Sequence, residues 1–359
     1  MYKVVNGKNR IFYLDFIRAL AIILVILAHV TRLFFYNSQL GSFNMHISAP
    51  FIDFGVLGVP LFLMISGALL LNRDYELFDF LNRRFTRVLI PFLFWGVVFP
   101  IVKIYTDGEV ATVANFYKMF INDNYWFVWM ILGIYLFIPV INSFVKEYEM
   151  KGVEYFLVIW LVVMFLNTIG KYPFHQLELS YFAGYLGYFV LGYYLSAKKF
   201  NLSDKSLLLI GIVIFLIFSI INIDHTLSLS FIKGKLLYYK YETIVTVLQS
   251  AGLFMLIRYF TLCSINDKTS FKYKIYSFFK DTAIFKIIFS ISIFSYGIYL
   301  CHYVPLFGFK WISENIIPVF TWNPVIWLPI MLIVILGIAW FIIWIFDHIS
   351  ILQKVNGAH

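Results

Sequence analysis

Three ionisable residues interrupt a long apolar segment near the N-terminus, YLDFIRALAIILVILAHVTR at Tyr13–Arg32. Asp15 and Arg18 are three residues apart, a spacing that lets their side chains pair on one face of a helix. His29 follows Arg18 by about three helical turns, a rise of roughly 16 Å, so all three residues share that face. Charged groups inside a membrane-spanning helix are costly, and they persist where they pair or take part in chemistry.

The chemistry that suits this set is proton transfer during acyl transfer. A neutral imidazole such as that of His29 can take a proton from a hydroxyl nucleophile, while Asp15 and Arg18 neutralise each other. The spacing therefore predicts a catalytic set of Asp15, Arg18 and His29. The alternative is a structural ion pair beside a histidine whose hydrogen bonds are satisfied near the membrane interface.

Arg83, Arg84 and Arg87 form a basic cluster in LNRRFTRVLIPFL at Leu81–Leu93. Guanidinium groups bind phosphate bidentately, and we expect the cluster at the N-terminus of a helix, where free N–H groups favour anions. This predicts a site for a phosphate-bearing cytoplasmic donor such as a coenzyme A thioester. Ordinary enrichment of cytoplasmic segments in arginine explains the same residues without a ligand.

Weaker candidates for substrate binding are Ser66, Trp126, Glu242, Tyr299 and His302. Tyr299 and His302 are three residues apart on one face, and His302 is expected at a membrane depth like that of His29. Trp126 suits sugar stacking, although interfacial tryptophans usually anchor a protein in the membrane. Ser66 precedes a helical glycine, which favours close helix packing, and Glu242 also fits a solvated position.

The composition of the chain is that of a polytopic membrane protein. Its 359 residues are 62% hydrophobic and only 13% charged, with a mean hydropathy of +0.84, whereas soluble domains have about 25% charged residues. We expect an all-α bundle forming a single domain over residues 1–359. Apolar runs of spanning length lie at roughly 11–34, 54–71, 88–105, 126–145, 153–170, 181–196, 206–223, 242–262, 286–308 and 324–346.

Ten spans place both termini on one side, and the positive charge assigns that side. Most of the 28 Lys and Arg residues fall in segments on the side of the N-terminus, which predicts cytoplasmic termini in a multi-pass protein of the cytoplasmic membrane. Outer loops are expected at 35–53, 106–125, 224–241 and 309–323. The inner loop at about 263–285 is rich in lysine and is expected to lie along membrane lipids.

Topology also accounts for the formal net charge of +9 without nucleic acid. Two cysteines, Cys263 and Cys301, are too few for a disulfide framework, and no Cys or His spacing indicates a metal. We therefore expect neither a nucleic-acid partner nor a metal cofactor.

Several of these motifs, in this order, resemble the acyltransferase 3 family of integral membrane acyltransferases. The resemblance rests on Arg18 and His29 with ten residues between them and Asp15 in place, VPLFLMISG at 59–67, Arg84 and Arg87 before a proline, the tryptophan-rich stretch at 125–141 and IYLCH at 298–302. It covers nearly the whole chain. It is closest to the branch without an attached esterase-like domain, which includes the enterobacterial-common-antigen O-acetyltransferases.

The resemblance implies a function and roles for residues. An acyl group, usually from acetyl-CoA bound from the cytoplasm, would pass to a hydroxyl of a cell-surface glycan or lipid-linked sugar. His29 would be the essential base, Arg18 would support the donor or the histidine, and Arg84 and Arg87 would hold coenzyme A phosphates. The alternative from another class is a transporter or exporter of glycan or acyl precursors, which also carries intramembrane charges.

Overall fold

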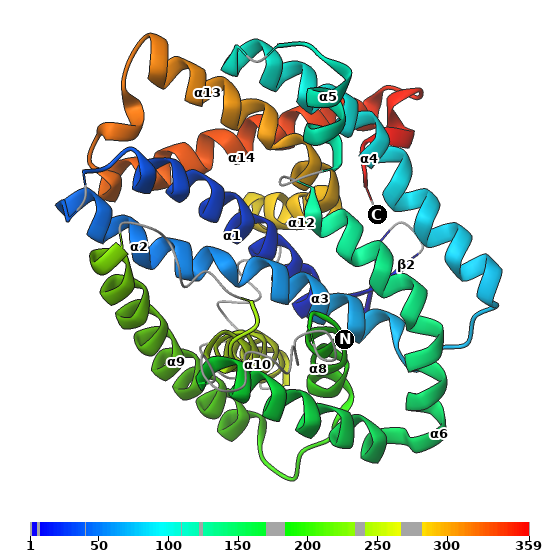
Figure 1. Cartoon of the computed structure of the whole chain (residues 1–359). Coiled ribbons are helices and arrows are strands. Elements are labelled where there is room, and N and C mark those ends of the chain that lie inside the picture. Colours follow the sequence, from blue (N-terminus) through cyan, green and yellow to red (C-terminus); the bar gives the residue numbers. More distant parts are fainter. Residues whose placement is uncertain are drawn as a thin grey trace. The chain divides into compact units, whose positions relative to one another are not determined.

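The computed structural model describes residues 2–5, 8–39, 41–108, 110–121, 125–169, 184–233, 241–266 and 282–358. Its helices are α1 (Phe12–Tyr36), α2 (Phe43–Val56), α3 (Gly58–Leu70), α4 (Leu77–Asp107), α5 (Val113–Ile121), α6 (Trp126–Ile169), α8 (Leu186–Ala197), α9 (Asp204–Lys233), α10 (Ile244–Asn266), α12 (Ala283–Cys301), α13 (Tyr303–Asn315) and α14 (Pro324–His348), with short 3₁₀ turns η2 (Val319–Thr321) and η3 (Leu352–Val355) (Figure 1). A short antiparallel hairpin, β1 (Tyr2–Val5) and β2 (Lys8–Ile11), precedes α1.

The prediction of an all-α polytopic membrane bundle is confirmed. Seven helices in the described part of the chain are long and apolar enough to cross a membrane, and α12 with α13 adds an eighth span if the bent pair is counted as one. All ten apolar segments expected from the sequence overlap helices. The structure has fewer separate spans than the ten expected from the sequence because of α6 and α8.

The 44 residues of α6 contain two of the expected spans. At 1.5 Å per residue the parts before and after Glu149 are about 34 Å and 30 Å long, each near the hydrocarbon thickness of a bilayer. Its backbone leaves the helical region at Glu149, where φ is 50°, so two membrane-length halves meet at a kink. Helix α8 has only 12 residues and is about 18 Å long, which is too short to cross the bilayer core alone.

The expected outer loop at 35–53 is wrong over its second half, because α2 begins at Phe43. His46, Pro50 and Asp53 lower the hydropathy of this stretch and hide the helix from a search for apolar runs. In the structure α2 and α3 together form a span from Phe43 to Leu70. Most of the lysine-rich inner loop, residues 267–281, lies outside the described residues.

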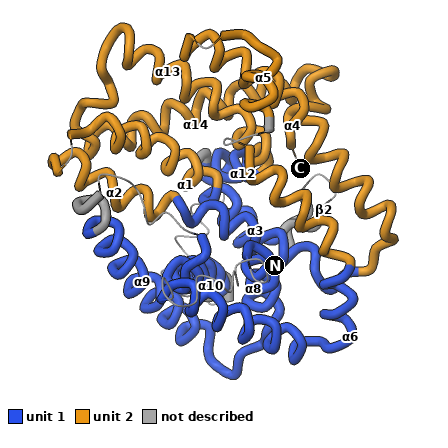
Figure 2. The backbone as a smooth tube through the Cα atoms, in the orientation of Figure 1, with its two compact units in different colours: residues 1–21, 56–73, 140–292 blue, residues 22–55, 74–139, 293–359 orange. Residues whose placement is uncertain are grey.

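Two compact units make up the described chain, and Figure 2 colours them separately. Unit 1 contains residues 1–21, 56–73 and 140–292, and unit 2 contains residues 22–55, 74–139 and 293–359. The chain passes between the units several times, so neither is one continuous stretch. The expectation of a single domain stays a prediction.

Close helix packing at glycine organises unit 1. An ideal Cβ on Gly67 of α3 would lie 1.7 Å from the carbonyl oxygen of Phe189 in α8, and one on Gly192 would lie 2.0 Å from the carbonyl oxygen of Met64. The backbones of α3 and α8 therefore touch, as small residues allow in membrane helices. This confirms the packing interpretation of the Ser66–Gly67 pair.

A buried polar seam joins α9 to α10 in the same unit. Asn222 donates to Gln249 Oε1 at 3.0 Å, and Gln249 donates in turn to Ser219 Oγ at 3.0 Å. All three side chains are buried. Because each amide group in this seam has a partner, the two helices carry polar residues in an apolar segment without leaving them unsatisfied.

Unit 2 contains the bend that shapes the site. Helices α12 and α13 meet at His302 at an angle of 53°. Pro305, in the first turn of α13, has no N–H to bond the carbonyl of the preceding turn, and its ring disfavours a straight helix. The side chains after His302 therefore point in directions that differ from those they would have in a straight continuation of α12.

Candidate functional site

Two histidines from distant parts of the sequence meet in unit 2. His29 is carried by α1, and His302 stands at the bend between α12 and α13. Their ring centroids are 5.2 Å apart. His302 is fully buried and His29 is partly buried. The expectation that the two residues lie at a similar depth is matched by direct contact between their rings.

The hydrogen bonds of His302 define its tautomer. Its Nδ1 lies 2.6 Å from the carbonyl oxygen of Tyr299. A carbonyl can only accept, so Nδ1 carries the hydrogen and Nε2 of the neutral ring keeps its lone pair. This Nε2 is buried and has no hydrogen-bond partner among the described residues. A buried acceptor left in this way costs about 1–3 kcal/mol, so it is suited to a hydroxyl donor from a ligand.

Tyr303 is the third member of this cluster, and sequence reasoning missed it. Its Oη lies 3.2 Å from Nε2 of His29, and its ring centroid is 4.2 Å from that of His302. Consecutive residues on a regular helix point about 100° apart, so Tyr303 was not expected to share a partner with His302. The available signal was Pro305, which marks the bend.

Aromatic side chains surround the Tyr303 ring. Centroid distances are 5.3 Å to Phe99 and 5.5 Å to Tyr125. The Tyr125 hydroxyl donates to the carbonyl oxygen of Leu300 at 2.9 Å, which fixes this ring against the end of α12. Tyr303 itself is only 2% exposed. The phenol is thus held in a dry aromatic cage with its hydroxyl directed at His29.

Asp15 and Arg18 pair as predicted, in unit 1. Arg18 Nη1 lies 3.2 Å from Asp15 Oδ1, and the same oxygen accepts from Ser292 Oγ of α12 at 3.0 Å. Asp15 lies in the first turn of α1, where the helix dipole favours a negative charge. The side chains are 10% and 19% exposed for Asp15 and Arg18, so this is a largely buried ion pair with a hydroxyl as its third partner.

The arginine cluster lies on α4 in unit 2, but not at the start of that helix. The helix begins at Leu77, where the Glu76 carboxylate accepts from the N–H of Asp79 at 2.9 Å. The expected contribution of a free helix N-terminus is therefore wrong. The polar stretch from Asn82 to Arg87 separates the first turn of α4 from the apolar run that follows, so a search for apolar runs does not find where the helix begins.

Each of the three arginines has a different setting. Arg83 forms an exposed ion pair with Asp79. The guanidinium carbon of Arg84 lies 5.7 Å from the centroid of the Phe80 ring, a distance that fits a cation–π contact. Arg87 is exposed one turn further along. The guanidinium groups follow one exposed stretch of α4.

The weaker candidates fall into both units. In unit 2, Trp126 is the first residue of α6, and its ring lies 6.2 Å from that of Phe127, which packs at 5.5 Å on Tyr299. In unit 1, Ser66 Oγ donates to the carbonyl oxygen of Phe62 within its own helix, and Glu242 is partly buried just before α10. Only Trp126 and Tyr299 thus belong to the unit that holds the two histidines.

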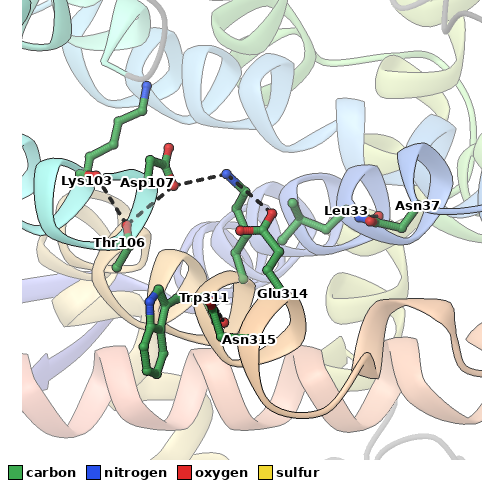
Figure 3. A network of polar contacts seen from close by, with 9 residues as sticks. Leu33, Asn37, Lys103, Thr106, Asp107, Trp311, Glu314 and Asn315 are labelled. Atoms are coloured by element: carbon green, nitrogen blue, oxygen red, sulfur yellow. Dashed lines mark hydrogen bonds and ion pairs between the residues drawn. The ribbon is translucent and has the colours of Figure 1, made fainter. Parts of the chain in front are cut away.

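A second polar group in unit 2 connects α13 to α4. Lys310 Nζ lies 3.0 Å from Asp107 Oδ1 and 3.8 Å from Glu314 Oε1 (Figure 3). The same ammonium lies 5.6 Å from the centroid of Phe307, whose ring packs at 5.3 Å on Phe99 of the Tyr303 cage. One face of α13 therefore runs from Tyr303 through Phe307 to this ion pair.

Fold and site together define a multi-pass membrane protein with a histidine–tyrosine cluster buried in its helices. A family model described as an acyltransferase domain matches residues 11–344, and the chain belongs to this family of acyltransferases. The resemblance inferred from the motifs is thereby confirmed. No solved structure matches the chain.

Curated relatives fall into two groups. The nodulation protein NolL of Sinorhizobium fredii is 28% identical over 147 residues, 39% of this chain and 38% of that protein, and the NolL protein of Mesorhizobium japonicum is similar at 28% over 150 residues. The chain thus spans less than two fifths of the nodulation proteins in these matches. A protein of Staphylococcus aureus named "probable poly-beta-1,6-N-acetyl-D-glucosamine export protein" is 24% identical over 91% of this chain and 90% of its own length.

Proposed function

We propose that this protein is an O-acyltransferase of the cytoplasmic membrane that moves an acetyl group from cytoplasmic acetyl-CoA to a hydroxyl of an extracytoplasmic glycan or lipid-linked sugar. The observation that carries the proposal is the 3.2 Å contact between His29 Nε2 and a hydroxyl group, that of Tyr303. This distance is within the reach at which an imidazole removes a hydroxyl proton. His29 is accordingly the general base.

The buried nitrogen of His302 supplies a second function in the same cluster. Its Nε2 keeps a lone pair and has no partner among the described residues. An incoming sugar hydroxyl can donate to this nitrogen and be held beside His29. Tyr299 fixes the ring of His302 through its carbonyl, and Trp126 packs nearby through Phe127.

In this proposal the arginines of α4 bind the donor, acetyl-CoA. Coenzyme A carries phosphates that suit guanidinium groups, and Arg84 and Arg87 lie on one helix with Arg83. Arg18, neutralised by Asp15, supports the donor in this proposal. Because coenzyme A thioesters are cytoplasmic, the basic end of α4 faces the cytoplasm.

The acceptor is proposed to be a glycan that contains amino sugars. The support is the name of the staphylococcal relative, which refers to a polymer of N-acetyl-D-glucosamine. On this chain, the half-exposed Trp311 beside the Lys310 ion pair offers a ring for stacking and charged groups for sugar hydroxyls.

The test uses purified protein in lipid nanodiscs with radiolabelled acetyl-CoA and an extracted cell-surface glycan. Wild-type protein should transfer label to the glycan, and His29→Ala should lower the rate by about 10²–10⁴-fold. His46→Ala is the matched control, since His46 Nδ1 bonds the carbonyl oxygen of Ser42 within its own segment. Equal transfer by the His29 variant would refute the role of His29 as the base.

A second candidate function is export of a polysaccharide, favoured by the name of the same staphylococcal relative. Glycan-loaded vesicles separate the two functions. Movement of glycan across the membrane without acetyl-CoA, and without acetylation of the product, would favour export. Label on the glycan with no net movement favours acyl transfer.

A further inference from the structure

We propose that Tyr75 and Phe80 bind the adenine ring of the coenzyme A donor, with the Tyr75 hydroxyl bonded to the edge of the adenine that carries its amino group. The inference rests on the proposed acyltransferase function and assigns a site to the part of the donor that arginines do not recognise. Tyr75 lies between α3 and α4, and Phe80 lies near the start of α4. Both residues belong to unit 2.

The two rings form a stacked pair outside the apolar spans. Their centroids are 4.3 Å apart, and the angle between the ring planes is 19°. Phe80 is buried, whereas Tyr75 is partly exposed. Phe80 is therefore the inner layer of the stack and Tyr75 the outer one. A ring held in this way is a platform for a nucleobase, because every base has a flat face that can stack on an aromatic side chain.

The hydroxyl group of Tyr75 is the feature of this stack that points to a ligand. Its oxygen is buried and has no hydrogen-bond partner among the described residues. Burial raises the pKa of Tyr75 to about 12, so the phenol keeps its proton near neutral pH and can both donate and accept. A buried hydroxyl without a partner destabilises the free protein. The amino group of adenine and the ring nitrogen beside it supply the missing donor and acceptor.

Charge decides between a base and a phosphate as the group bound at Tyr75. Asp74 and Glu76 flank Tyr75 in the sequence, and both are exposed. The Glu76 carboxylate also caps α4 by accepting from the N–H of Asp79 at 2.9 Å. A phosphate beside Tyr75 would meet these negative charges, whereas a neutral base with an amino donor would not be repelled. The surroundings of Tyr75 therefore favour the adenine end of the donor.

The arginines follow directly after the stack along α4. The guanidinium carbon of Arg84 lies 5.7 Å from the centroid of the Phe80 ring, so Phe80 contacts both Tyr75 and Arg84. Arg87 lies about one turn beyond Arg84 on the same helix. In coenzyme A a single ribose separates the adenine from the 3′-phosphate and the diphosphate. The base at the stack and the phosphates at Arg84 and Arg87 thus match the order of groups in the donor.

Calorimetric titration of purified full-length protein in nanodiscs tests the site with three probes. They are coenzyme A, its etheno form, in which a two-carbon bridge blocks the amino edge of the adenine, and phosphopantetheine, which lacks the adenosine. Tyr75→Phe should weaken coenzyme A binding by about 2–12-fold, the value of a hydrogen bond between neutral groups, and leave phosphopantetheine binding unchanged. Wild-type protein should lose a similar factor with the etheno form, and Tyr75→Phe should bind both nucleotides equally. Tyr75→Ala also removes the stacking ring and should weaken coenzyme A binding by about a further 5-fold or more.

The unfolding temperature of the ligand-free protein separates a ligand-binding hydroxyl from a structural one. Tyr75→Phe should hold or raise this temperature, because the variant loses a buried hydroxyl that has no partner. A lower temperature would show that the protein itself uses the hydroxyl, and would overturn the proposal. Tyr105→Phe is the matched control, because Tyr105 is a tyrosine of the same helix that is 82% exposed. It should bind all three probes as wild-type protein does.

The titrations also separate failure of this site from failure of the proposed function. If Tyr75→Phe binds coenzyme A as tightly as wild-type protein, or weakens coenzyme A and phosphopantetheine equally, the adenine site is refuted while acyl transfer stands. If wild-type protein binds no coenzyme A and transfers no label from acetyl-CoA, the proposed function itself fails, and the site fails with it.

Discussion

The ring of His302 lies 5.2 Å from the ring of His29, centroid to centroid, although the two residues stand near opposite ends of the chain. The fixed tautomer of His302 leaves one bare nitrogen in this pair. The nitrogen of His29 that faces the cluster is already in contact with a hydroxyl. The two rings thus offer one nitrogen engaged with a protein hydroxyl and one that is open to a ligand.

Replacing His302 by asparagine should separate its two contacts. The amide of His302→Asn can still donate to the carbonyl oxygen of Tyr299, but it provides no acceptor at the place of Nε2. Transfer to glycan should fall by about 2–12-fold, the value of a hydrogen bond between neutral groups worth about 0.5–1.5 kcal/mol, with a higher KM for glycan. Donor affinity should stay the same. The measurement is glycan-dependent transfer at saturating acetyl-CoA.

His348→Asn is the control for that substitution, because His348 also bonds a backbone carbonyl, that of Trp344, at 2.8 Å, and is exposed. It should transfer at the wild-type rate. If His302→Asn keeps the wild-type KM and rate for glycan, the bare nitrogen has no part in binding the acceptor.

Sequence reasoning was most successful where the relevant contacts lie within one helix. The spacing of Asp15 and Arg18 predicts their ion pair, because residues three apart are neighbours on a helix. Contacts between helices depend on bends and caps that periodicity does not contain. Tyr303 reaches His29 because the chain turns by 53° at His302. The turn lets the side chains of two consecutive residues, His302 and Tyr303, both contact His29.

Helix boundaries were the other source of error. Apolar runs define where a helix crosses the membrane, but α4 starts at Leu77 because Glu76 caps its first turn. In α6 the segment KEYEMKG, between two apolar runs, contains the kink at Glu149, where φ is 50°. The two expected spans therefore follow each other with almost no loop between them. A cap in α4 and a kink in α6 thus set helix boundaries that hydropathy does not show.

The ion pair of α1 should show strong coupling in a double-mutant cycle. Asp15→Asn removes the carboxylate that pairs with the largely buried Arg18 guanidinium, and breaking such a pair costs about 3–5 kcal/mol. Asp15→Asn combined with Arg18→Met removes both charges and should recover part of the loss. The measurement is the unfolding temperature of purified protein in detergent. Additive losses in the double variant would show that the two side chains do not interact.

Donor binding should depend on two of the three arginines of α4 more than on the third. Arg84→Ala with Arg87→Ala should weaken coenzyme A binding by about 10²-fold or more, since a hydrogen bond to a charged group is worth about 1.5–3 kcal/mol. Arg83→Ala should have a smaller effect, because this guanidinium is paired with Asp79. Calorimetric titration with coenzyme A and with its 3′-dephospho form measures both effects. Unchanged affinity in the double variant would mean that these arginines serve membrane topology alone.

The contact between α3 and α8 should not tolerate a single added methyl group. In Gly67→Ala the new Cβ would meet the Phe189 carbonyl oxygen at 1.7 Å, so the two backbones must separate, at a cost of about 1–3 kcal/mol or more. Gly133→Ala in α6 is the matched control, because no atom lies within 4 Å of its ideal Cβ and alanine favours helix by about 0.5–1 kcal/mol. Unfolding temperatures in detergent should fall for Gly67→Ala and hold or rise for Gly133→Ala. Equal temperatures for Gly67→Ala and wild-type protein would mean that the two helices are not in backbone contact.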